Sequence, residues 1–106
     1  MDGRELAARI ARGEAPVVID VRSGFEYRAG HIPGAPHLPT SHIPFRRGRL
    51  PENRDERLVL TCEHGPRAQL AARVLRFLGF KNVELLEGHM AAWRTAKLPM
   101  DTTAKN

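Results

Sequence analysis

The chain alternates short apolar runs with amphipathic segments, a pattern that predicts strands and helices in turn. The β-branched run at residues 17–21 and the apolar run at residues 58–61 are typical of strands covered on both faces of a parallel sheet. Two shorter strands are expected at residues 35–38 and 83–86. Since helical segments separate the strands through short connections, we expect an α/β fold, with a mainly parallel sheet and helices on both faces.

The helices are predicted from their end signals and apolar spacing. Asp2 is a candidate N-cap for a helix that ends near Gly13, and Ser23 and Glu26 form a capping box that begins a short helix. Three further helices are expected, over residues 40–48 with a break at Pro44, residues 67–78 and residues 88–96.

At 106 residues, the chain is expected to form one domain with a single core, and residues 97–106 are expected to be a frayed tail. Only one cysteine is present, so no internal disulfide can form. A free thiol on a loop suits a reducing compartment, and we expect a cytoplasmic protein. The first ten residues carry charges without an apolar stretch, which argues against a secretory signal, and no segment is long enough to span a membrane.

Charge favours anionic partners. Seventeen Lys and Arg against twelve Asp and Glu give a net charge of +5, which suits small anions or an acidic protein partner. The basic cluster at residues 46–49 raises the question of nucleic-acid binding. However, the chain has only six aromatic residues, and they do not interleave with basic ones as in base-stacking surfaces. We therefore expect no nucleic-acid partner.

The only cysteine, Cys62, stands where a predicted strand passes into a predicted helix. It opens a loop that ends at Arg67. Backbone N–H groups and the positive end of the helix dipole at such a turn stabilise negative charge on the sulfur. Cys62 is therefore a candidate nucleophile, and its alternative role is that of an inert buried thiol.

The loop Cys62-Glu63-His64-Gly65-Pro66-Arg67 resembles the active-site loop of the rhodanese family of sulfurtransferases. Residues 20–35, with Asp-Val-Arg followed by Glu-Tyr-Arg-Ala-Gly-His-Ile-Pro-Gly-Ala, resemble the N-terminal signature of that family. Residues 86–93, Leu-Glu-Gly-His-Met-Ala-Ala-Trp, resemble its C-terminal signature. The resemblance implies the rhodanese-like fold with a mainly parallel sheet of about five strands, and a persulfide carried on Cys62 without a cofactor.

The resemblance also implies a reaction and roles for the residues around Cys62. The thiolate attacks the outer sulfur of a small anionic donor such as thiosulfate, and cyanide or a thiol then accepts that sulfur. The residues expected to bind the substrate are Glu63, His64, Gly65, Pro66 and Arg67, with backbone N–H groups of residues 63–67 around the sulfur. Those expected to support the loop, chiefly as an ion-pair network, are Asp20, Arg22, Glu26 and His31.

Several residues depart from the pattern of the family. Pro66 lacks an N–H group, although proline suits the first turn of a helix. Glu63 places a carboxylate beside the sulfur, which by itself opposes a negative charge there and weakens the case for thiosulfate. Ala68 and His89 stand where small hydroxylated residues and glycine are common.

Other functions remain open from the residues alone. A catalytically silent binding module could retain the fold. A cysteine phosphatase or arsenate reductase uses a similar loop, but the related phosphatases place the arginine one residue later than Arg67. A metal site is not expected, because Cys62 and His64 supply at most two ligands locally and the other histidines form no ligand ladder. These remaining histidines are His31, His37, His42 and His89.

Overall fold

The computed structural model describes residues 1–45 and 50–102, so the basic cluster at residues 46–49 lies outside the described residues. Its elements follow in the order α1 (Gly3–Ala11), β1 (Val17–Asp20), α2 (Gly24–Ala29), the 3-10 helix η1 (Thr40–Phe45), β2 (Leu58–Thr61), α3 (Pro66–Phe77), β3 (Val83–Leu85) and α4 (His89–Thr95). Strands and helices alternate as the apolar pattern predicts.

Within the described residues, β1, β2 and β3 form a parallel sheet in that order. Val17 is paired with Leu58 across the first ladder, and Leu58 is paired with Val83 across the second. The expected strand at residues 35–38 is reduced to a single parallel bridge between Asp20 and His37. Pro36 and Pro39 flank this bridge, and because proline has no N–H group it cannot continue a ladder. The described sheet thus has three strands where about five were expected.

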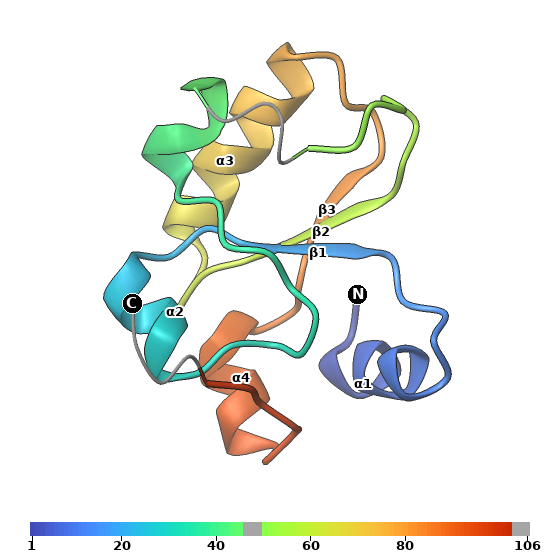
Figure 1. Ribbon diagram of the computed structural model, residues 1–106, viewed down its shortest axis with the longest axis vertical. Coiled ribbons are helices and arrows are strands. Elements are labelled where there is room, and N and C mark those ends of the chain that lie inside the picture. Colours follow the sequence, from blue (N-terminus) through green and yellow to red (C-terminus); the bar gives the residue numbers. More distant parts are fainter. Residues whose placement is uncertain (46–49, 103–106) are drawn as a thin grey trace.

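Helices cover both faces of the sheet, as expected (Figure 1). Because successive side chains point to opposite faces of a strand, Ile19 and Leu60 pack with α3 and η1, whereas Val18 and Val59 pack with α1 and α4. The α3 face buries Ala68, Ala71, Ala72 and Leu75, and the opposite face buries Leu6, Met90 and Trp93. The fold is therefore an α/β sandwich of helices around a parallel sheet.

The helix starts follow the predicted end signals. The Asp2 side chain accepts hydrogen bonds from two backbone N–H groups of α1. Ser23 and Glu26 form a reciprocal capping box at the start of α2. In α3, Pro66 occupies the first turn, where its missing N–H group has no partner to lose. These signals fix where the chain leaves each loop, including the loop that contains Cys62.

The segment after α4 packs along the body of the protein as far as Asp101. Asp101 and His31 exchange two backbone hydrogen bonds, and the indole N–H of Trp93 donates to the carbonyl of Pro99. Residues 103–106, the end of the tail that we expected to fray, lie outside the described residues. None of the helices in the described ranges is both long and apolar enough to cross a membrane.

Candidate active site

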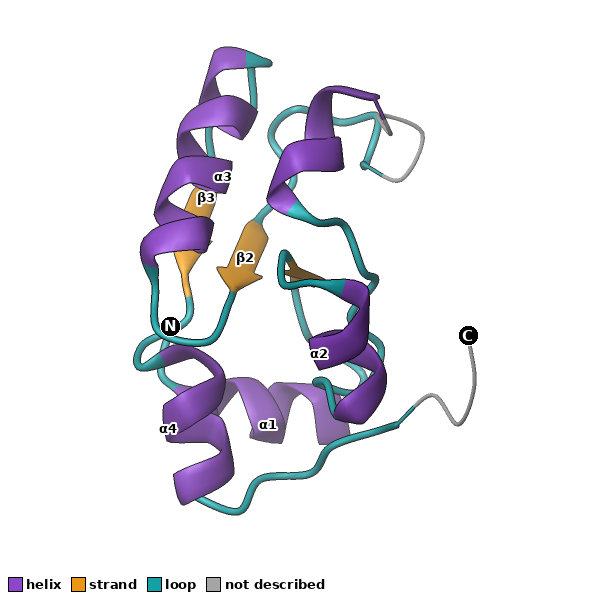
Figure 2. Cartoon of the chain, turned by 90° about the vertical axis from the view of Figure 1, so that its left-hand side faces the viewer, coloured by secondary structure: helices purple, strands orange, loops and turns teal. Residues whose placement is uncertain are grey.

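Cys62 lies at the carboxyl end of β2, the central strand, where the chain turns into α3 (Figure 2). This edge of a parallel sheet is where ligands of α/β folds usually bind. The side chain is completely covered and contacts the core under α3. The Gly65 N–H donates a hydrogen bond of 2.9 Å to its Sγ atom. The buried thiol therefore faces a main-chain donor of the loop.

Gly65 makes this contact through a backbone conformation that favours glycine. Its φ is 131°, and it directly precedes the first turn of α3. A Cβ atom at this position would lie 3.3 Å from the Nε2 atom of His89. The glycine therefore turns its amide toward the sulfur of Cys62. The backbone N–H groups of residues 63–67 were expected to surround the sulfur. Among the hydrogen bonds of the described residues, the Gly65 N–H is the one that reaches it.

His89 and Met90, at the start of α4, bind the backbone of Cys62. The Nδ1 atom of His89 accepts the Cys62 N–H at 3.3 Å, and the next residue, Met90, donates its N–H to the Cys62 carbonyl at 3.0 Å. Burial lowers the pKa of His89, and the neighbouring His64 lowers it further. A neutral ring can keep Nδ1 as an acceptor. From the sequence, His89 was noted only as a departure from the glycine that is common in the family. Its contact with the Cys62 N–H was therefore not predicted.

Glu63 is neutralised by two guanidinium groups. Its carboxylate forms ion pairs with Arg94 of α4 and, at 3.6 Å, with Arg22. Sequence reasoning missed Arg94, because only the fold brings α4 next to the loop. The charge of Glu63 was expected to oppose negative charge on Cys62. These pairs compensate that charge within the site.

Asp20, the last residue of β1, and Arg22 form a buried pair. Arg22 is bound to both carboxylate oxygens of Asp20, with a shortest distance of 2.8 Å, and donates to the Gly30 carbonyl at 2.6 Å. Since Arg22 also contacts Glu63, the pair links the first strand to the cysteine loop. That Asp20 and Arg22 support the loop stays a prediction.

Glu26 and Arg67 form a separate, bidentate pair at the surface. Two guanidinium nitrogens of Arg67 lie 2.6 and 3.0 Å from the two carboxylate oxygens of Glu26. The hydrogen bond from Arg67 is the main cause that lowers the pKa of Glu26 to about 2. The same bond raises the pKa of Arg67, and the interaction with Cys62 adds to that rise. Glu26 thus joins α2 to the start of α3, outside the Asp20–Arg22 pair.

The two histidines among the expected site residues have different surroundings. His64 is exposed on the cysteine loop. His31 is buried away from it, with Nδ1 donating to the Tyr27 carbonyl at 2.8 Å and its ring stacked on Tyr27 at 3.8 Å. His31 therefore supports the segment after α2, and no contact with the cysteine loop is described. Within residues 1–45 and 50–102, no group of three or more potential ligands could hold a metal ion.

A recess of about 220 Å³ opens beside the loop, between α2 and α4. Its lining combines the charged side chains Arg22, Glu26, Glu63 and Arg94 with the exposed ring of Phe25. A second groove is lined by Ser23, Thr40, Arg67 and Leu70, among others. A small ion in the recess would meet paired charges and one apolar wall.

Comparisons with known proteins identify relatives of this chain. The chain is 34% identical over 100 residues to a sulfurtransferase of Allochromatium vinosum, covering 94% of this chain and 92% of that protein. It is 36% identical over 99 residues to the thiosulfate sulfurtransferase GlpE of Pseudomonas putida, covering 92% of this chain and 86% of that one. The crystal structure of the Alr3790 protein from Anabaena matches with a TM-score of 0.87 at 26% identity, over 99% of this chain and 94% of that one.

The sequence profile of the rhodanese-like domain matches residues 2–96, nearly the whole described chain. That span includes the cysteine loop, both flanking signatures and every strand of the sheet. On this match and on the relatives above, the resemblance drawn from three short motifs is confirmed, and the chain belongs to the family of rhodanese-like domains.

Proposed function

We propose that this protein is a sulfurtransferase that carries a sulfane sulfur as a persulfide on Cys62. The observation that carries the proposal is the Gly65 N–H directed at the Cys62 Sγ atom, at the start of α3. A fixed main-chain donor and a helix N-terminus stabilise negative charge without any moving general base. The similarity to named sulfurtransferases supports the same conclusion.

The reaction proceeds in two displacements that keep one negative charge on the enzyme. The Cys62 thiolate attacks the outer sulfur of thiosulfate, the bond between the two donor sulfurs breaks, and its electron pair leaves with sulfite. Cys62 then carries a persulfide anion. Cyanide or a thiolate acceptor attacks the terminal sulfur, takes it as thiocyanate or as a new persulfide, and returns the thiolate of Cys62.

Each residue of the cysteine loop has its own role in binding the sulfur donor. Gly65 supplies the amide at the sulfur, Pro66 sets the first turn of α3, and Arg67 contributes its guanidinium toward an anionic donor. Exposed His64 and half-buried Glu63 border the approach to the loop.

Four further residues have supporting roles in the proposal. Asp20 and Arg22 hold the loop against β1, Glu26 holds Arg67, and His31 stabilises the segment after α2.

The partners follow from this chemistry. The donor is a small sulfur anion and the acceptor is cyanide, a small thiol or a thiol on an acidic protein. We place the protein in the cytoplasm, because a nucleophilic thiol persists in a reducing compartment. The proposal includes no cofactor, nucleic acid or membrane.

Intact-protein mass spectrometry tests the proposal. After exposure to thiosulfate and removal of the excess, the wild-type protein should gain one sulfur atom, which cyanide should remove. Cys62→Ser should gain none, and Cys62→Ala should lose transfer while keeping its circular dichroism spectrum. An unmodified wild-type protein would instead favour a silent binding module, and hydrolysis of an aryl phosphate without persulfide formation would favour a phosphatase.

A further inference from the structure

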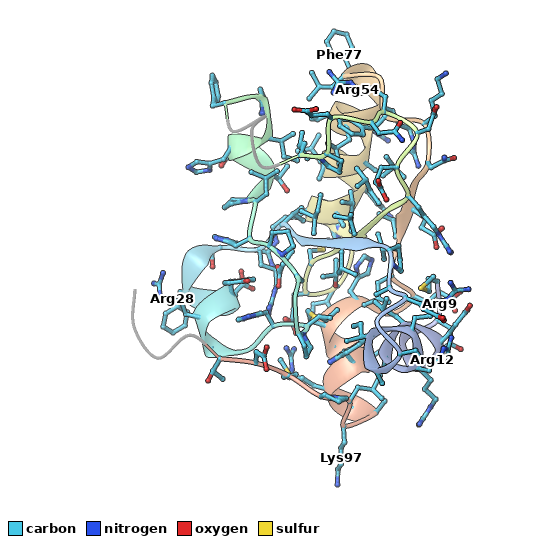
Figure 3. The ribbon with its side chains drawn as sticks, turned by 45° about the vertical axis from the view of Figure 1, so that its right-hand side comes forward. Arg9, Arg12, Arg28, Arg54, Phe77 and Lys97 are labelled. Atoms are coloured by element: carbon cyan, nitrogen blue, oxygen red, sulfur yellow. The ribbon has the colours of Figure 1, made fainter. Side chains whose placement is uncertain are left out.

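The charged side chains around the cysteine loop compensate one another. Three carboxylates meet three guanidinium groups in two separate groups of ion pairs within the described residues. The members are Asp20, Arg22, Glu63 and Arg94 in one chain of contacts, and Glu26 with Arg67 in the other. The net charge of +5 is therefore not concentrated at this site. The basic side chain of Lys97 points outward beyond the end of α4, and Arg9 and Arg12, which are paired with Glu5 and Glu14, point outward around α1 (Figure 3).

Within this set, an incoming donor can meet two pairs, since the side chains of Glu26 and Arg67 are 30% and 43% exposed and those of Glu63 and Arg94 are 23% and 44% exposed. The side chains of Asp20 and Arg22 are almost completely covered. Of the two accessible pairs, Glu26–Arg67 is the one that contains the arginine at the start of α3. Arg67 lies in the first turn of α3, at the end of the cysteine loop, and the charge of Cys62 adds to the rise of its pKa. Glu26 accepts one hydrogen bond from each terminal nitrogen of Arg67 and neutralises its charge, so a donor anion meets the full positive charge of the guanidinium only when Glu26 is displaced.

The charge of the donor decides how strongly this pairing matters. Thiosulfate brings two negative charges toward a thiolate, and it gains from a positive charge at the entrance more than a donor with one charge does. With Arg67 paired, the entrance is neutral and offers no such gain. A monoanionic donor, such as the persulfide of an uncharged thiol, meets half of that repulsion.

We propose that Glu26 is a specificity-determining residue, which by neutralising Arg67 directs the enzyme toward sulfane donors that carry one negative charge. This inference rests on the proposed function and names the donor class for the same site. The reaction of such a donor is balanced in charge. The Cys62 thiolate takes the outer sulfur of a persulfide anion, the S–S bond breaks, and the electron pair leaves on the thiolate of the donor.

Two stable donors of similar shape separate the effect of charge from that of chemistry. Thiosulfate is a dianion that releases sulfite, and methanethiosulfonate is a monoanion that releases methanesulfinate. In each variant, kcat/KM is measured for both donors with cyanide as the acceptor, and the ratio of thiosulfate to methanethiosulfonate is compared. Because each donor keeps its own leaving group throughout, changes in that ratio report the charge at the entrance.

Four proteins form a series of local charge, namely the wild type, E26Q, R67A and the double variant E26Q/R67A. Glutamine at this position still completes a capping box, so E26Q retains the start of α2. We expect the ratio to rise about three- to tenfold in E26Q, where Arg67 is released, and to fall by a similar factor in R67A, where Glu26 is left unpaired. The double variant should return close to the wild type. All differences should shrink at high ionic strength.

The outcomes separate this inference from the proposed function. If Cys62 accepts sulfur from both donors but the ratio is the same in E26Q and R67A as in the wild type, Glu26 does not select the donor. If both variants lower the two rates equally, the pair has a structural role only, and the inference is also overturned. If no variant and no donor gives a persulfide, the proposed function itself fails. Should E26Q not fold, R67A alone still tests the predicted fall.

Discussion

His89 is the residue whose role was least evident from its place in the sequence. It stands where the family commonly has glycine, yet its ring nitrogen accepts the N–H of the catalytic cysteine candidate and its own N–H binds the Leu86 carbonyl. Its φ of 53° explains how a position suited to glycine presents a side chain to the loop. The individual residues of this site therefore include a histidine that positions Cys62 without reaching its sulfur in any described contact.

We predict that His89 makes stability depend on pH. Because its pKa is lowered in the folded state, unfolding takes up a proton, so its contribution is present above pH 6.5 and is lost as the pH falls toward the folded pKa. His89→Ala should lower the free energy of unfolding by about 1–3 kcal/mol at pH 7.5, since the Cys62 N–H loses its acceptor. Urea denaturation at pH 7.5 and 5.5 measures both effects.

His89→Gln is the matched control, since its side-chain oxygen can accept a hydrogen bond but does not titrate. It should retain more stability than His89→Ala at pH 7.5 and lose less than the wild type on acidification. An unchanged pH dependence in both variants would show that the histidine is not the titrating group.

The turn between β2 and α3 is the element on which the site depends. Gly65 ends the loop in a left-handed conformation, Pro66 begins the helix, and the Thr40 hydroxyl of η1 binds the Arg67 carbonyl at 3.1 Å. Together, the glycine conformation, the proline and the Thr40 hydrogen bond fix the direction in which α3 leaves the sheet. The amide of Gly65 thereby acquires its position at the sulfur.

Gly65→Ala should impair both stability and sulfur transfer. The substitution forces a side chain into an unfavourable φ of 131° and brings its Cβ atom against His89, at an expected cost of about 1–3 kcal/mol. Gly34→Ala provides the control, because its φ of 80° is also unfavourable while its surroundings are open. Both variants should be destabilised in urea, but only Gly65→Ala should also slow persulfide formation. Equal transfer rates in the two variants would argue against a role for the Gly65 amide.

At the scale of the whole molecule, features set by neighbouring residues, such as strands and helix starts, could be predicted from the sequence. Contacts between elements that are distant in the sequence could not. Helix starts depend on neighbouring residues, so Asp2 and Ser23 were sufficient to place two of them. The three motifs likewise identified the family and the cysteine loop. Arg94 could not be assigned, because its pairing with Glu63 depends on how α4 packs beside the sheet. The fourth strand was overestimated, because two prolines limit it to one bridge.

Acid should destabilise the whole fold through its carboxylate pairs. Glu26 has a pKa of about 2 against an ordinary value of 4.5, because of its hydrogen bond with Arg67, and Arg57 lowers the pKa of Glu84. The stability from such depressed pKa values is present above pH 4.5 and is lost as the pH falls through the folded values. In denaturant titrations between pH 5 and 3, E26Q should therefore lose less stability than the wild type. Parallel curves for the two proteins would exclude a contribution from the Glu26–Arg67 pair.

The most direct test of the account follows one sulfur atom through Cys62. The protein is loaded with thiosulfate that carries a heavy isotope in its outer sulfur, freed of donor, and then mixed with cyanide. The account predicts about one equivalent of labelled thiocyanate per wild-type protein. It predicts none from Cys62→Ser. Labelled thiocyanate from the serine variant, or none from the wild type, would contradict a persulfide carried on Cys62.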